Sequence, residues 1–253
     1  MSVLVLILGF PPLPSPARPA TDDGLQQVRT LIARKQLETA EKMIVSQMMT
    51  TPRDPDLITL LAEVRVDQGR MPEAVKLLGD ANRLGGITAF RTALAGLAQT
   101  GAGRLDLAER QFRAAIRLDP NYAAAHYFLA RLLYTQNHFE EAIKEGKATA
   151  ALSPRFVRAY ENLGLCYEGK QQFQEAERWY LEAIGWENKG GARTEWPMLD
   201  LATMLIRNNR IEEAKSYLSQ AVTINPGNPR TVFEMGVLLE KSGNAEGALQ
   251  QFR

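Results

Sequence analysis

The sequence of 253 residues has one cysteine, Cys166, and two histidines, His126 and His138. A single cysteine excludes an internal disulfide, and two histidines are too few for most metal sites. The sequence also has no His-Glu-x-x-His, no paired Cys-x-x-Cys and no phosphate-binding glycine loop that ends in Lys-Ser or Lys-Thr. We therefore expect no catalytic residues, no metal and no cofactor, and we predict that the chain is not an enzyme.

Neither sign of charge is in excess. The chain has 30 lysines and arginines against 29 aspartates and glutamates, which gives a net charge of +1. Binding to nucleic acid needs a basic face, because the release of counterions from the phosphates supplies much of the affinity. Runs of lysine or arginine are also missing from the sequence. The composition therefore argues against a nucleic-acid partner.

Long apolar runs are missing too. Val3–Leu8 is apolar, but as a helix it spans only about 10–15 Å, less than half of a bilayer core. We expect no transmembrane anchor, and we interpret residues 1–20 as a signal-like or disordered segment. The small residues of Ser15-Pro16-Ala17 favour a secretory signal cleaved after Ala17, although no lysine or arginine precedes the run. Cleavage would place the protein in a periplasm or outside the cell; a disordered tail or a misplaced start would leave it in the cytoplasm.

What the sequence does contain is a regular spacing of alanine. Seven alanines follow one another at intervals of 34, 34, 34, 34, 38 and 34 residues, which is typical of stacked repeats. They are Ala40, Ala74, Ala108, Ala142, Ala176, Ala214 and Ala248. Twelve residues before each lies another small or modest residue, four residues after most lies a larger one, and a proline often follows after twelve.

The third unit illustrates the expected local structure. Apolar residues at spacings of three and four predict one helix over Ala89–Thr100 and a second over about Leu105–Leu118. Glycines at 101 and 103 favour a turn between them, and the proline at 120 ends the second helix. Because antiparallel helices approach closely only where side chains are small, we expect Phe112 to fill the space beside Gly96 and Ala108.

These units resemble the tetratricopeptide repeat. Its small residue in the first helix, alanine in the second, bulky residue one turn later and terminal proline are all present, and Glu140-Glu141-Ala142 looks like the family's second-helix opening. The resemblance implies an all-α fold, a right-handed α-solenoid superhelix of antiparallel helix pairs over residues 21–253. The expected units are 21–54, 55–88, 89–122, 123–156, 157–194, 195–228 and a truncated 229–253. The fifth is four residues longer, and we expect the extra residues in a loop near 186–193.

The resemblance also implies that the first helices line a concave groove that binds a protein or peptide. Tyrosine, tryptophan and arginine supply much of the energy at interfaces. The candidate groove residues are Phe90, Leu97, Tyr127, Arg131, Tyr134, Arg158, Trp196 and Phe233. An alternative is that Tyr127 and Tyr134 pack between units while Arg131 pairs with Glu161 or Glu168. The lysines and asparagines with which some family members clamp chaperone tails are not found in that arrangement, so such a receptor is disfavoured.

Two further functions stay open. The sequence stops within a second helix without the polar capping element that usually ends a solenoid, so we expect a fragment of a longer protein. The repeats could then recruit substrate for a catalytic domain beyond residue 253, for example a glycosyl- or sulfo-transferase. Alternatively, the open end could associate with a second copy through Leu249 and Phe252. The identity of the partner is not specified by these residues.

Overall fold

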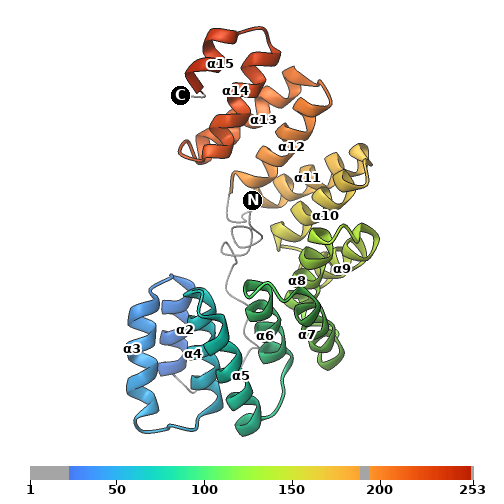
Figure 1. Ribbon diagram of the computed structural model, residues 1–253. Helices are drawn as coiled ribbons and strands as arrows, with labels where there is room; N and C mark the ends of the chain where they lie inside the picture. The colour runs from blue at the N-terminus through green and yellow to red at the C-terminus, as the bar shows by residue number, and fades with distance from the viewer. Residues whose placement is uncertain (1–22, 189–193, 252–253) are drawn as a thin grey trace. The chain divides into compact units, whose positions relative to one another are not determined.

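The computed structural model describes residues 23–188 and 194–251, and every regular element within them is a helix (Figure 1). The first helices of the repeats are α2 (Asp23–Ala33), α4 (Pro55–Asp67), α6 (Ala89–Gly101), α8 (Ala123–Thr135), α10 (Val157–Gly169), α12 (Trp196–Arg207) and α14 (Pro229–Lys241). The second helices are α3 (Leu37–Met48), α5 (Met71–Gly85), α7 (Leu105–Leu118), α9 (Phe139–Leu152), α11 (Phe173–Asn188), α13 (Ile211–Ile224) and α15 (Ala245–Gln251).

The chain divides into two compact units, of which unit 1 ends at Thr135 and unit 2 begins at Gln136. Within each unit the helices pack as consecutive antiparallel pairs, and each pair contacts the next. The prediction of an all-α solenoid is confirmed. So are the two helices of the third unit, because α6 ends one residue after the expected Thr100 and α7 has the expected bounds.

The seven regularly spaced alanines are all buried, and each lies on a second helix. Phe112 fills the space beside Gly96: a methyl group at Gly96 would lie 2.5 Å from its Cε1. Tyr180 approaches Gly164 in the same way in unit 2. These distances are far inside van der Waals contact, so the glycines are required by packing, as expected for Gly96.

Hydrogen bonds between backbone atoms close the turns that join the two helices within the repeats. The residue five positions before each buried alanine has a positive φ, between 57° and 82°. These residues are Lys35, Gly69, Gly103, Asn137, Gln171, Asn209 and Gly243. In the third repeat the amide of Gly103 donates to the carbonyl of Thr100 (3.0 Å), and that of Arg104 donates to Gln99 (2.9 Å). This pair of bonds is the Schellman motif, which satisfies the last carbonyls of the first helix.

The connections between repeats use side chains more often. Asp54 caps α4 by accepting from the amides of Asp56 (2.7 Å) and Leu57 (3.3 Å), and Thr88 accepts from Arg91 at the start of α6. In the connection between the second and third repeats, Gly86 has a φ of 77° and occupies the position at which several other repeats have proline. The expected insertion loop is partly wrong: residues 186–188 are helical and extend α11, while residues 189–193 lie outside the described part of the chain.

A partly buried ion pair joins the second helix of the first repeat to the next repeat. Arg65 donates through Nη1 to Glu41 Oε2 (2.7 Å) and through Nη2 to Glu41 Oε1 (2.5 Å), while Gln68 adds a bond of 3.0 Å. These hydrogen bonds, that of Arg65 above all, lower the pKa of Glu41 to about 2 against the opposing effect of burial. The pair therefore links two repeats through a carboxylate that stays charged in acid.

Candidate partner-binding site

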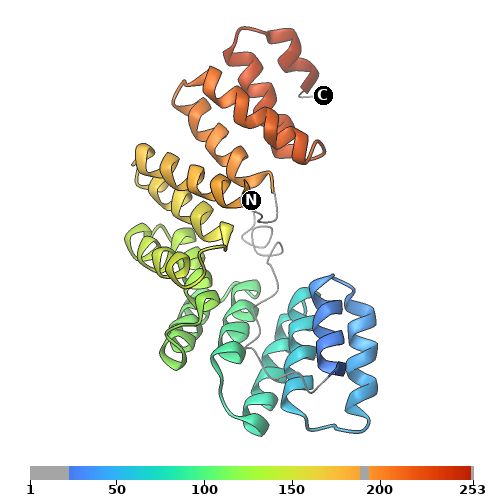
Figure 2. The same ribbon diagram turned by 180° about the vertical axis from the view of Figure 1, so that it is seen from behind.

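The first helices form a continuous inner layer within each unit. Helices α2, α4, α6 and α8 contact one another in sequence in unit 1, and α10, α12 and α14 do so in unit 2. Figure 2 shows second helices lying against the first helices of their own repeats within each unit, as for α6 with α7 and α10 with α11. The candidate groove residues all lie on first helices, at α6, α8, α10, α12 and α14. This layer is therefore where the predicted site must be sought.

In unit 1 the structure buries two of the candidates. Leu97 is 6% exposed and Tyr127 is 2% exposed, so both side chains lie in the packed interior of the unit. Arg131 Nη1 donates to Tyr127 Oη (3.1 Å), and its guanidinium carbon lies 5.8 Å from the centre of that ring. Tyr127 also packs against Phe128, with 5.4 Å between ring centres. The structure brings Tyr127 and Arg131 together, but the tyrosine serves packing.

The remaining candidates differ in exposure. Phe90, Arg131, Tyr134 and Arg158 are half-buried. Trp196 on α12 is 36% exposed and Phe233 on the neighbouring α14 is 55% exposed. Unit 2 therefore presents two large aromatic side chains on adjacent first helices.

A buried carboxylate that the sequence reasoning missed holds the start of α12. Glu195 precedes Trp196, and its Oε1 accepts from the amides of Asn225 (2.8 Å) and Asn228 (2.9 Å) in the connection between α13 and α14. Burial disfavours the charge of Glu195, but the hydrogen bonds that it accepts outweigh this effect and lower its pKa. Asn228 in turn caps α14 through Arg230 N (2.9 Å). Hydrogen bonds through Glu195 and Asn228 thus link the N-terminal ends of α12 and α14, the helices that carry Trp196 and Phe233.

Two ion pairs in unit 2 also link consecutive first helices. Arg207 on α12 binds Glu168 on α10 (3.0 Å), and Glu168 accepts from Tyr180 as well (3.0 Å). Arg230 on α14 binds Asp200 on α12 (2.8 Å). Burial raises the pKa of Asp200 to about 6, and the arginine offsets this only in part. The residues of each pair lie 39 and 30 positions apart, so only the repeat register could have suggested them.

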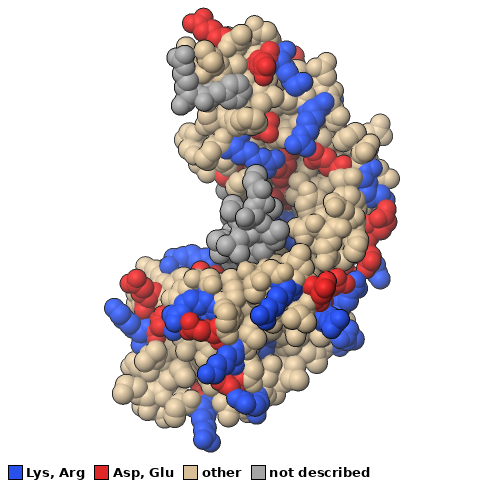
Figure 3. Space-filling view, in the orientation of Figure 1, with Lys and Arg blue, Asp and Glu red and all other residues tan. Residues whose placement is uncertain are grey.

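The described residues contain no group of three or more histidine, cysteine, aspartate or glutamate side chains that could hold a metal ion. Cys166 is buried, and burial raises the pKa of its thiol to about 12. It is therefore a protonated packing residue at neutral pH rather than a nucleophile. Figure 3 shows acidic and basic side chains interspersed over the surface, in line with the near-zero net charge.

Two predictions concern the ends of the chain. The signal-like Met1–Ala17 lies outside the described residues, as does Phe252, whereas Leu249 is described and exposed. None of the described helices combines the length and the apolar character that a bilayer crossing requires.

Comparison with known proteins agrees with the fold. Family models of the tetratricopeptide repeat match residues 93–155, 157–189 and 198–228, together about half of the chain. The protein CTR9 homolog of Arabidopsis thaliana is 22% identical, over 93% of this chain and 25% of its own length. The type IV pilus assembly protein PilF of Pseudomonas aeruginosa is 25% identical over 62% of each chain. This chain therefore spans between a quarter and about three-fifths of these relatives.

The crystal structure of the APC/C hetero-tetramer Cut9-Hcn1 superposes with a TM-score of 0.73 at 13% identity, over 86% of this chain and 42% of the other, which shows similarity of fold alone. The repeat spacing, the buried alanines, the glycines beneath aromatic rings and the family matches lead to one conclusion. The chain belongs to the tetratricopeptide repeat family.

Proposed function

We propose that this protein is a non-enzymatic scaffold that binds a protein or peptide on the face of its first helices. Helical repeats of this kind build extended surfaces that serve protein–protein interaction. The observation that carries the proposal is the exposure of Trp196 and Phe233 on the adjacent helices α12 and α14. Large exposed apolar side chains on neighbouring helices are typical of interaction sites, and tryptophan is enriched among residues that dominate binding energy.

Arg230 adds a charge to this surface. Its side chain is 40% exposed, whereas its partner Asp200 is almost fully buried. The guanidinium therefore retains donors that can meet a carboxylate of the bound segment, while its position is set by the aspartate. Arg131 is held in a comparable way by Tyr127 in unit 1. The half-buried Phe90 and Tyr134 belong with Arg131 to the proposed surface of unit 1, and the half-buried Arg158 belongs to that of unit 2.

The experiment is quantitative affinity capture with the full chain as bait, followed by measurement of the dissociation constant of each captured partner. Trp196→Ala and Phe233→Ala should each weaken binding by more than about 1 kcal/mol, roughly fivefold. Leu181→Ala, at an exposed leucine of the second helix α11, is the matched control and should leave binding unchanged. If both aromatic variants bound every partner at full strength, the first-helix surface would not be the site.

Two parts of the functional prediction rest on sequence alone. A role as the recruiting module of a larger enzyme requires a catalytic domain beyond residue 253, and sequencing of the reading frame downstream of that codon tests it. Export requires removal of Met1–Ala17, and the mass of the mature protein expressed with its own N-terminus tests that. A mature chain that retained its first residues would place the protein in the cytoplasm.

A further inference from the structure

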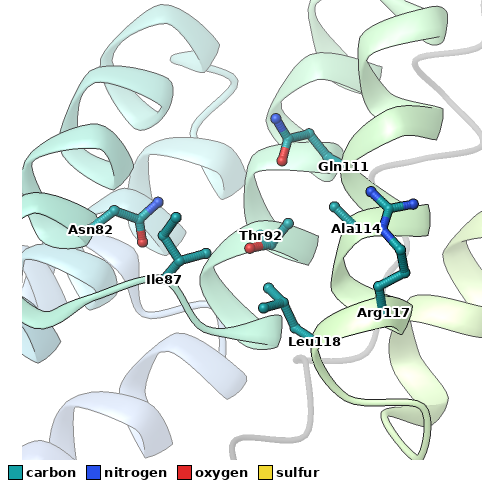
Figure 4. A pocket seen from close by; sticks show the side chains of 7 residues that line it. All are labelled: Asn82, Ile87, Thr92, Gln111, Ala114, Arg117 and Leu118. Carbon is teal, nitrogen blue, oxygen red and sulfur yellow. The ribbon is translucent and has the colours of Figure 1, made fainter.

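A furrow lies between the second helices α5 and α7 of unit 1, with α6 as its floor (Figure 4). Its volume is about 450 Å³. The lining residues used below are Asn82, Ile87, Thr92, Gln111, Arg117 and Leu118. Figure 4 places Asn82 and Ile87 on one side, Gln111, Arg117 and Leu118 on the other, and Thr92 between them. The furrow is made mainly by second helices, so it is separate from the first-helix surface.

At the corresponding positions of unit 2 the chain carries aromatic rings on α10 and α11, which belong to one apolar cluster with Ala150 of α9. The ring of Tyr160 on α10 lies 6.1 Å from that of Trp179 and 6.2 Å from that of Trp186, both on α11. These residues stand 68 positions, or two periods of 34, after Thr92, Gln111 and Leu118 respectively. Unit 1 therefore has a threonine, a glutamine and a leucine, all smaller than an aromatic ring system, at the positions where unit 2 has a tyrosine and two tryptophans.

A position on α5, one turn before Asn82, also carries less side-chain volume than its counterpart in unit 2. Lys147, whose ammonium lies over the ring of Tyr167 in unit 2, corresponds to Gly79 on α5. A methyl group at Gly79 would meet no atom within 4 Å. Ile87 is 67% exposed and Leu118 is 51% exposed, so the walls offer apolar surface to solvent. Unit 1 therefore carries less side-chain volume than unit 2 at these positions of the repeat.

Two polar side chains at this furrow, Asn82 and Arg117, have hydrogen-bonding capacity that the described residues do not satisfy. Asn82 Oδ1 is buried and has no hydrogen-bond partner among the residues that the structure describes. A buried acceptor without a donor is costly, so a ligand that supplies an N–H gains from binding there. Arg117 on the rim makes no ion pair within the described ranges, whereas the neighbouring Arg113 pairs with Glu109 (2.9 Å). An anionic group of a ligand would therefore find a guanidinium ready to receive it.

We propose that the α5/α7 furrow is a docking site for a tryptophan side chain of a partner protein, carried on a segment with an adjacent acidic residue. The ring would take the place that Trp179 and Trp186 take in unit 2, between Ile87 and Leu118. Its indole N–H would donate to Asn82 Oδ1, and the acidic residue would pair with Arg117. A bound aromatic ring within reach of a guanidinium gains a cation–π contribution as well.

The test is a titration of the full chain, followed by NMR, with the acetylated and amidated tetrapeptide Gly-Trp-Asp-Gly. We expect saturable shifts of the Asn82 side-chain amide and of the methyl groups of Ile87 and Leu118. Replacing the tryptophan of the peptide by alanine should abolish them, and replacing its aspartate by lysine should weaken binding several-fold. The absence of saturable shifts, or equal binding of the alanine peptide, would overturn the proposal.

Variants of the protein give a second readout. Gln111→Trp places a ring where unit 2 has one and should weaken peptide binding more than tenfold without lowering the melting temperature. Leu118→Trp, at an exposed position, does the same should the first variant fold poorly. Arg117→Gln should reduce affinity several-fold for the aspartate peptide only, while the exposed Arg34→Gln is the matched control. Full affinity in both tryptophan variants would contradict the assignment.

Discussion

At the scale of single residues, the fold depends on positions where only glycine, with no side chain, fits beneath an aromatic ring. Gly96 and Gly164 lie beneath the rings of Phe112 and Tyr180, and a Cβ at either position would enter the ring. The fourth repeat differs, since Gly146 stands at the bulky position of α9 and Leu163 on α10, the first helix of the next repeat, lies against it. The space at that position is therefore filled from the neighbouring repeat instead of from within its own.

Gly96→Ala should destabilise the protein. Overpacking typically costs about 1–3 kcal/mol, and the better helix propensity of alanine returns about 1 kcal/mol, so we expect a net loss of up to about 2 kcal/mol in urea denaturation. Adding Phe112→Leu should recover part of the loss because it makes room for the methyl group. Gly79→Ala, in a helix interior with open space, is the control and should gain about 1 kcal/mol. Equal effects of the two alanines would refute the steric argument.

Glu41 should make stability depend on pH in acid. Its pKa falls from 4.5 in the unfolded chain to about 2 in the folded one, because Arg65 and Gln68 donate to the carboxylate. The unfolded chain then binds more protons between these values, so the stabilisation present above pH 4.5 is lost as the pH falls toward about 2. The difference in unfolding free energy between wild type and Glu41→Gln should shrink across that window.

The matched control is Glu38→Gln, which removes an exposed carboxylate from the same helix. Denaturation of the three proteins in urea at several pH values between about 2 and 7 provides the comparison. A wild-type advantage over Glu41→Gln that stayed constant down to the lowest pH would show that the carboxylate of Glu41 has an ordinary pKa.

At the scale of elements, the turns inside the repeats share one backbone conformation with different residues. Glycine adopts the left-handed region without strain, whereas Lys35, Asn137, Gln171 and Asn209 adopt it at a cost. In the described turn at Gln171, the amides of Gln171 and Gln172 donate to Glu168 (2.8 Å) and Tyr167 (2.9 Å). These bonds involve backbone atoms only, so the side chain at the left-handed position contributes little to the turn.

Gln171→Gly should therefore stabilise the protein. Relief of the left-handed strain is worth about 1–2 kcal/mol, and the extra freedom of glycine in the unfolded chain returns about 0.4–1 kcal/mol. We expect a net gain of about 0.5–1 kcal/mol by urea denaturation. The reverse change, Gly103→Gln, should cost a similar amount at the equivalent position. A loss of stability in Gln171→Gly would mean that its side chain supports the turn.

Much of this local structure could be predicted from the sequence. The alanine spacing gave the helix pairs, and the small residue twelve positions earlier identified the contact between Gly96 and Phe112. The left-handed residues were harder to foresee, because glycine marks only some of the turns. The α5/α7 furrow could have been predicted by comparing the repeats with one another. In the repeat register, Gly79 and Thr92 occupy the positions that Lys147 and Tyr160 occupy in unit 2.

At the scale of the whole molecule, each described helix contacts only helices close to it in sequence. The stability of such an array is a sum of repeat terms and neighbour terms, and local opening can occur without global unfolding. The exposed fraction of each candidate site residue could not be predicted from the sequence, because it is set by contacts between neighbouring helices. Whether Tyr127 or Phe233 is open depends on what packs against each helix, which the period alone does not specify.

A local defect should therefore stay local. Hydrogen exchange of Gly96→Ala should accelerate in α6 and α7 and in the helices that contact them, α4, α5 and α8. The amides of α12 to α15 should keep their wild-type rates. Phe112→Leu, which leaves Gly96 unchanged, is the companion variant and should affect the same helices. Acceleration of all helices to the same extent would show that the chain unfolds as one cooperative body.

The left-handed turns also offer a way to measure curvature in solution. Asn137, Gln171 and Asn209 are exposed, and their side chains leave the turn hydrogen bonds to the backbone. Cysteines introduced there would react with maleimide dyes, whereas the inaccessible native thiol at Cys166 would stay unlabelled. Pairs of such dyes, spaced by whole repeats, would form a molecular ruler that reports how the helical array bends when it captures a ligand.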